Sequence, residues 1–121
     1  MHITPAERNY LYAVKKLQSA QASVKAVHLA RYLHVSKPSV STMLRQLKKD
    51  GLVNVSETSG ERRITLSEKG EAEAGRIKMH RTALERMFLM LGAPADAAEK
   101  DAATVEPYLS DETYSALCSV Q

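Results

Sequence analysis

One stretch, residues 36–51, constrains the fold more than any other, because it has both a helical period and defined ends. Ser36 can cap the first free N–H groups, and Pro38 is tolerated in the first turn, where its missing N–H would have no helical partner. Gly51 ends the helix at a position that needs a left-handed conformation. The apolar side chains recur at i, i+3, i+4 and i+7, the spacing of one buried helix face: Val40, Met43, Leu44 and Leu47.

The other face of this helix carries hydroxyl and cationic side chains and no acid. Short hydroxyls at the front with cations behind suit a helix whose first half meets base edges while its flanks hold phosphates. The alternative is an ordinary amphipathic helix with a solvated basic face, and the flanking segments decide between the two. The candidate DNA contacts on this helix are Ser36, Lys37, Ser39, Ser41, Thr42, Arg45, Lys48 and Lys49.

Two helices are predicted upstream of this stretch. Thr4 and Glu7 have the spacing of a capping box, in which each side chain bonds the other's backbone N–H. A polar connection over residues 19–23 leads to a short second helix, whose apolar residues at 26, 29, 30 and 33 again have helical spacing. Only two residues separate it from Ser36. Two short amphipathic helices joined so tightly, the second basic on its free face, are typical of a helix-turn-helix.

A β-hairpin is predicted after Gly51. Residues 52–56 and 62–66 are rich in strand-forming side chains, and they flank a Gly-containing loop at residues 57–61. If the hairpin acts as a wing, Arg62 and Arg63 would contact phosphate beside the DNA groove. A small solvated hairpin is the alternative interpretation of the same pattern.

A long helix is predicted from about residue 68 to 91, capped by Ser67 and ended by Gly92. Such a helix is a rod of roughly 35 Å, which usually needs a surface beyond its own chain to pack against. Pro107 interrupts the helical region that follows, and a last helix begins near residue 110. We therefore expect a dimer through the apolar side chains from about residue 77 onward, in particular Ile77, Leu84, Phe88 and Leu117.

Together these elements predict a mainly α fold with a small β wing. A winged helix-turn-helix DNA-binding domain would occupy residues 1–70, and an α-helical dimerisation domain would occupy residues 71–121. Charge separates the two halves, since residues 1–66 carry 11 Lys/Arg and 4 Asp/Glu (+7), whereas residues 67–121 carry 6 and 10 (−4). A basic first half indicates a polyanion as its partner, and double-stranded DNA is the expected one.

Other classes of protein fit the sequence less well. No apolar run could span a membrane, the first five residues lack a signal-peptide pattern, and the single Cys118 leaves no internal disulfide, so a cytoplasmic protein is expected. Cys118 is expected to be a small buried residue, with a redox sensor as the alternative. No catalytic set can be assembled from the spacing, so an enzyme is not predicted. A winged-helix module that binds protein would not need the cations over residues 37–49 and 62–63.

The chain resembles the diphtheria toxin repressor and manganese transport regulator family. Residues 36–41, 49–53 and 64–70 carry the resemblance, which continues through residues 84–85, 91–92, 105–106 and 109–110. The length is similar to that of the short, two-domain manganese-regulator branch. The resemblance implies a homodimer that represses metal-uptake genes, through a near-palindromic operator, when Mn²⁺ or Fe²⁺ binds between the two domains.

The resemblance also implies where metal ligands should lie. In the first helix they fall on Asn9 and Tyr12, and the histidine of the long helix falls on Arg81 or, with the diphtheria repressor's spacing, on His80. The later positions fall on Ala103, Glu106 and Pro107, while Glu99 occupies an ancillary position.

Most of these side chains are poor ligands. Mn²⁺ and Fe²⁺ need several carboxylate and imidazole ligands together, and alanine or proline donates nothing through its side chain. We therefore expect that operator binding requires no metal cofactor. The alternative is a remnant site that still holds manganese or iron weakly, formed by Asn9, His80, Glu99 and Glu106.

Overall fold

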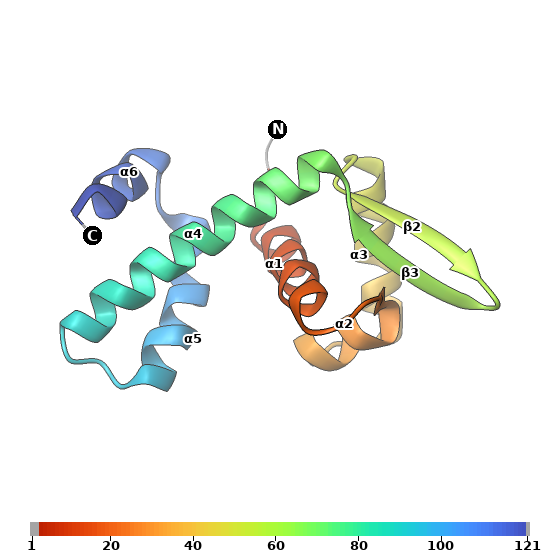
Figure 1. The fold of residues 1–121 in the computed structure, drawn as a ribbon, viewed down its shortest axis with the longest axis horizontal. Coiled ribbons are helices and arrows are strands. Elements are labelled where there is room, and N and C mark those ends of the chain that lie inside the picture. The colour runs from red at the N-terminus through yellow and green to blue at the C-terminus, as the bar shows by residue number, and fades with distance from the viewer. Residues whose placement is uncertain (1–2, 121) are drawn as a thin grey trace.

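One long helix joins two groups of shorter elements in the computed structural model, which describes residues 3–120 and so leaves Met1 and His2 of the N-terminal segment outside (Figure 1). This helix is α4, Glu68–Met90. The N-terminal group consists of α1 (Pro5–Ala20), β1 (Val24–Lys25), α2 (Ala26–Leu33), α3 (Lys37–Lys49), β2 (Val53–Thr58) and β3 (Glu61–Leu66). The C-terminal group consists of α5 (Ala95–Val105), the 3₁₀ turn η1 (Glu106–Tyr108) and α6 (Asp111–Val120). The predicted fold class, mainly α with a small β wing, is confirmed.

The helix ends form as the sequence predicts. The backbone N–H of Thr4 donates to Glu7 Oε1 at 3.0 Å, and the N–H of Glu7 donates to Thr4 Oγ1 at 3.1 Å, so the capping box of α1 is complete. Ser36 caps α3 by accepting a hydrogen bond from the N–H of Ser39 at 3.2 Å. Gly51 follows α3 with a φ of +75°. These ends fix where α3 begins and stops.

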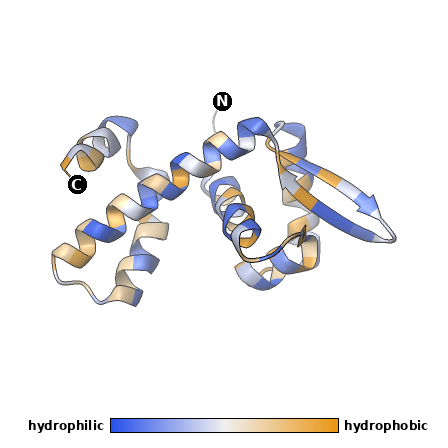
Figure 2. Cartoon of the chain, viewed as in Figure 1, coloured by the Kyte–Doolittle hydropathy of each residue, from blue (hydrophilic) through white to orange (hydrophobic). Residues whose placement is uncertain are grey.

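The sheet is larger, and its turn tighter, than the sequence indicates. The strands lie in the order β1-β3-β2, all antiparallel, and Thr58 pairs with Glu61. Only Ser59 and Gly60 remain in the loop, with φ values of 55° and 78°. The predicted five-residue loop was therefore wrong, because two positive φ angles allow the type of two-residue turn that matches strand twist. Figure 2 shows that the hairpin is hydrophilic toward its tip and hydrophobic at its base.

Two cores lie along α4. The first is formed by α1–α3 and the sheet, and it includes Ala74 and Ile77 from the first part of α4. The second is centred on Leu84, Ala102 and Tyr114, with partly buried side chains of the C-terminal group packed around them. The helix therefore belongs to both groups and holds one against the other.

The exposure of several side chains in α4 and α6 differs from what the sequence predicts. Ile77 is 0% exposed and Leu84 is 1% exposed, so the chain itself buries both side chains and leaves them little surface for the predicted dimer interface. Phe88 and Leu117 only partly cover the second core and keep some exposed surface. Cys118 is exposed rather than buried, and it lines open pockets together with residues of α4. No helix within residues 3–120 is both long and apolar enough to cross a membrane.

Candidate DNA-binding surface and interdomain site

The free face of α3 is assembled as its periodicity predicts. Val40, Leu44 and Leu47 are buried and hold α3 against the first core. A tight turn precedes it, in which His34 adopts a left-handed φ of 56°. The exposed side chains are Ser36, Lys37, Ser39, Thr42, Arg45, Lys48 and Lys49. The structure thus brings one surface of hydroxyls and cations to solvent, without an acidic side chain among them.

The hairpin contacts this helix directly. Arg62 Nη2 donates a hydrogen bond to Ser41 Oγ at 2.7 Å, so Ser41 is half-buried and its hydroxyl is engaged by the wing. Arg63 is exposed, and its Nη2 lies 3.8 Å from the carboxylate of Glu61. Arg63 Nη1 also donates to Ser23 Oγ at 3.5 Å, so Arg63 is the more exposed of the two arginines but is not unpaired, while Arg62 orients the wing against α3.

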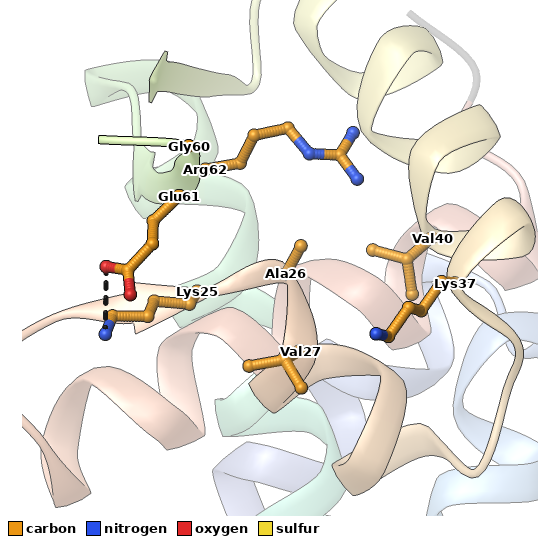
Figure 3. Close-up of a pocket in the computed structure, with 8 residues that line it drawn as sticks. All are labelled: Lys25, Ala26, Val27, Lys37, Val40, Gly60, Glu61 and Arg62. Atoms are coloured by element: carbon orange, nitrogen blue, oxygen red, sulfur yellow. Dashed lines mark ion pairs between the residues drawn. The ribbon is translucent and has the colours of Figure 1, made fainter. Parts of the chain in front are cut away.

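A pocket of about 220 Å³ separates the wing from α2 and α3 (Figure 3). Lys37 and Arg62 face it from opposite sides, and Lys25 lines it from β1. The ammonium of Lys25 lies 3.1 Å from Glu61, and its hydrogen bond and charge hold the pKa of the Glu61 carboxyl below its usual value. Sequence reasoning missed Lys25, because the two-residue strand that carries it has no periodicity of its own.

A second cluster lies between α1 and the C-terminal group, around the fully buried Glu106. Arg8 of α1 pairs with both oxygens of this carboxylate, with Nε donating to Oε1 at 3.1 Å and Nη2 to Oε2. Burial by itself lowers the pKa of Arg8, but the hydrogen bond and charge of Glu106 outweigh it and raise that pKa. The hydroxyl of Tyr114 donates to the backbone carbonyl of Glu106 at 2.7 Å. Arg8 carried no signal in the sequence.

His80 also belongs to this cluster, although its Nδ1 makes no hydrogen bond to the other members. Its ring stacks on Tyr114 with the centroids 3.7 Å apart, and its Nδ1 lies 3.6 Å from Glu106 Oε2, too far for a hydrogen bond. Burial lowers the pKa of His80, and the carboxylate of Glu106 only partly opposes that shift. Burial also raises the pKa of Tyr114, so the phenol stays protonated as a donor.

A third cluster forms where the family resemblance places metal ligands in α1 and α4. Arg81 Nη2 donates to Asn9 Oδ1 at 2.8 Å, and the guanidinium carbon lies 3.8 Å from the centroid of the Tyr12 ring. Ala103 and the exposed Glu99 line the same pocket. A guanidinium, itself a cation, therefore occupies this position.

The residues present do not fit a divalent metal. The four candidate ligands fall into two clusters, His80 and Glu106 beside Arg8, and Asn9 and Glu99 around Arg81. Within residues 3–120, no three His, Cys, Asp or Glu side chains are grouped as a metal site. The oxygens of Glu106 already accept hydrogen bonds from a cation, and Mn²⁺ or Fe²⁺ would have to displace it.

Comparisons with known proteins match both halves of the chain. Residues 2–60 match the family described as iron dependent repressor, N-terminal DNA binding domain, and residues 67–120 match iron dependent repressor, metal binding and dimerisation domain. The transcriptional regulator MntR of Escherichia coli O157:H7 is 29% identical over 108 residues, which cover 89% of this chain and 68% of that protein. The iron-dependent repressor IdeR of Mycobacterium tuberculosis is 28% identical over 112 residues, covering 92% and 47%.

Solved structures show the same arrangement. A manganese-dependent transcriptional repressor in complex with manganese has a TM-score of 0.82 and 25% identity, over 93% of this chain and 51% of that one. The manganese regulator SloR has a TM-score of 0.80 and 26% identity, over 98% and 54%. This chain therefore spans about half the length of those two chains.

Proposed function

This chain belongs to the iron-dependent repressor family, and from that membership we propose that it represses transcription as a homodimer on a near-palindromic operator, without a divalent metal. The observation that carries the DNA-binding part is the free face of α3, where exposed hydroxyls and cations lie together beside the wing. In this proposal the protein is not an enzyme, and it acts in the cytoplasm, where its DNA partner is found.

The roles on α3 follow from the chemistry of the two halves of the helix. The hydroxyls of Ser39 and Thr42, near its start, are short enough to let the helix approach base edges. The cations of Lys48 and of Arg63 on the wing suit backbone phosphates, which carry no sequence information. Ser41 instead positions the wing through Arg62.

The homodimer is supported by apolar side chains that the described part of the chain leaves uncovered. Met90 and Leu91, at the end of α4, are 79% and 78% exposed. Phe88 and Leu117 add partly exposed surface next to the second core. The dimerisation domain matched at residues 67–120 covers all four residues. A two-fold dimer presents two copies of α3, which is why a near-palindromic operator is proposed.

The proposal that operator binding needs no divalent metal is supported by the side chains at the family's metal-ligand positions. The family-site positions hold a neutral amide in Asn9, a phenol in Tyr12, a guanidinium in Arg81 and a methyl group in Ala103, while Glu106 is paired with Arg8. The alternative position in α4 is the imidazole of His80, which lies in the other cluster, beside Glu106. None of the first four offers an anionic carboxylate or an imidazole at neutral pH. A metal that binds the competent and incompetent states equally shifts neither.

Competition binding on operator and random DNA tests the assignment of roles. The operator is first selected from genomic fragments by gel shift. We expect Ser39→Ala or Thr42→Ala to weaken operator binding more than random-DNA binding, by about 1–3 kcal/mol if a base contact is lost. Lys48→Ala or Arg63→Ala should weaken both alike and lower the salt slope by roughly one unit per phosphate contact.

The matched control for these variants is Lys100→Ala, which removes an exposed cation on α5, away from α3. It should leave both affinities unchanged. Equal losses on both DNAs for all four α3 and wing variants would refute the division of roles. No loss in any of them would point to the alternative, a winged-helix module that binds protein.

A further inference from the structure

We propose that Arg8 and Arg81 are positioning residues, whose guanidinium groups tie α1 to α4 and η1 and thereby fix how α3 is presented to DNA. The inference rests on the proposed function for its DNA consequence, but the tie itself can be measured without DNA. It assigns a role to two arginines that lie outside the DNA-binding surface described above.

The two ties join the same short part of α1 to the rest of the molecule. Arg8 pairs with Glu106 of η1, and the neighbouring Asn9 accepts a hydrogen bond from Arg81 of α4. Tyr12, one helical turn further along α1, lies under the same guanidinium. At the first contact the cation is Arg8 of α1, and at the second it is Arg81 of α4, which contacts side chains of α1.

The pair between Arg8 and Glu106 makes separation costly. The Glu106 side chain is fully buried, and Arg8 satisfies both of its oxygens in a bidentate pair, a geometry that lysine cannot reproduce. If α1 moved away, this carboxylate would lose its cation while the C-terminal group still surrounded it. An unpaired buried charge destabilises far more than the pair stabilises, so the separated state is strongly disfavoured.

The contact of Arg81 needs no anion. Its guanidinium lies over the ring of Tyr12 and donates to the amide oxygen of Asn9, so a ring face and a neutral acceptor hold the cation. Arg81 and Tyr12 also line the pocket that holds Ala103. A guanidinium keeps its charge at every physiological pH and is part of the chain, so this tie does not depend on the supply of a metal ion.

The ties reach α3 through the first core. Leu11 and Val14 of α1 are buried in the same core as Val40 and Leu44 of α3. Close-packed interiors transmit such constraints because they do not deform continuously. Holding α1 against α4 and η1 therefore also holds the orientation of α3 relative to the C-terminal group, which the proposed dimer uses to space its two copies of α3.

The direct test is a distance measurement on the full chain. In a Cys118→Ser background, spin labels are placed at Arg31→Cys on α2 and Asp101→Cys on α5, both exposed positions, and labelled protein is diluted with unlabelled protein. We expect one narrow distance distribution that chelator or added Mn²⁺ leaves unchanged. Arg8→Gln combined with Arg81→Gln should broaden it and weaken operator binding by about tenfold or more, while random-DNA binding changes little.

The controls separate positioning from folding. Arg76→Gln removes an arginine whose ion pair, with Glu73, lies within α4, and this variant should keep the narrow distribution. If the double Gln variant loses its helical circular dichroism, Arg8→Lys, which keeps the charge but not the bidentate geometry, replaces it and should broaden the distribution partially. A folded double variant whose spin-label distance distribution equals that of the parent protein would overturn the proposal. A parent distribution that becomes narrower when Mn²⁺ is added would also overturn it. If the parent protein does not bind DNA, the proposed function is refuted instead. The spin-label distances would still show whether Arg8 and Arg81 hold α1 against α4 and η1.

Discussion

Glycine 70 shows how closely two backbones approach where the DNA-binding elements meet α4. The N–H of Ser67 donates to the carbonyl of Leu52 at 3.0 Å, and the Ser67 hydroxyl donates to the carbonyl of Gly51 at 2.6 Å. A Cβ at Gly70 would lie 1.9 Å from the Leu52 carbonyl oxygen. The start of α4 therefore presses on the turn after α3, and only a residue without a side chain fits there.

Gly70→Ala should lower the free energy of unfolding by about 3 kcal/mol, because backbone rather than a flexible side chain must move. The matched control is Gly75→Ala in the same helix, where a Cβ meets nothing within 4 Å. That variant should raise the free energy of unfolding by about 0.5–1 kcal/mol, since alanine favours the helix. Urea unfolding followed by circular dichroism measures both, and a neutral Gly70→Ala would contradict the close approach.

At the scale of whole elements, some apolar side chains of α4 are buried within the chain, and others remain exposed and available to another surface. Ile77 and Leu84 are inside the two cores, whereas Met90 and Leu91 stand out at its end. The last helix, α6, buries Tyr114 and leaves Leu117 partly exposed. The stripe that the sequence presents as one face is therefore split by the way α1, α5 and α6 pack around the helix.

This split gives opposite expectations for two leucines. Leu117→Glu should keep the fold and reduce the fraction of dimer, together with operator affinity, because it places a charge on the proposed interface. Leu84→Glu should instead unfold the second core, since a carboxylate would be buried without a partner. Sedimentation at several concentrations and circular dichroism separate the two outcomes. A Leu117→Glu protein that dimerises like its parent would remove α6 from the interface.

For the molecule as a whole, the α1 and α4 positions to which the family resemblance assigns metal ligands are joined by groups of the chain itself. Arg8 and Arg81 bring positive charge to α1, α4 and η1, as a divalent ion would, but without a ligand equilibrium. Lowering the metal concentration would then leave the arrangement of the two groups unchanged. Regulation would have to act through protein level or through a different effector.

Chelator-stripped protein should therefore bind labelled operator with the same affinity before and after addition of Mn²⁺, Fe²⁺, Co²⁺ or Zn²⁺. The expected change is less than about twofold, because a ligand shifts an equilibrium only by its differential affinity for the two states. Fluorescence anisotropy in buffers of constant ionic strength makes the comparison, with Mg²⁺ as the control for general screening of phosphates. A tenfold gain with any one metal would show that Asn9, His80, Glu99 and Glu106 still form a working site.

Signals that act within a few residues determined most of the fold. The capping box of Thr4 and Glu7, the cap at Ser36 and the turn at Gly51 each depend on side chains close in sequence, and all form as predicted. The helical periodicity also placed the exposed face of α3, except that Ser41 is half-buried beneath Arg62. Local backbone hydrogen bonding and amphipathic spacing are enough for these features.

Tertiary structure decided the rest. The strand β1 exists only because Val24 and Lys25 pair with β3, and the burial of Ile77 depends on helices packed from elsewhere in the chain. Above all, Arg8 meets Glu106 across 98 positions of sequence. A single arginine has no period and no motif, and its role arises only when folding removes water from the carboxylate that it faces.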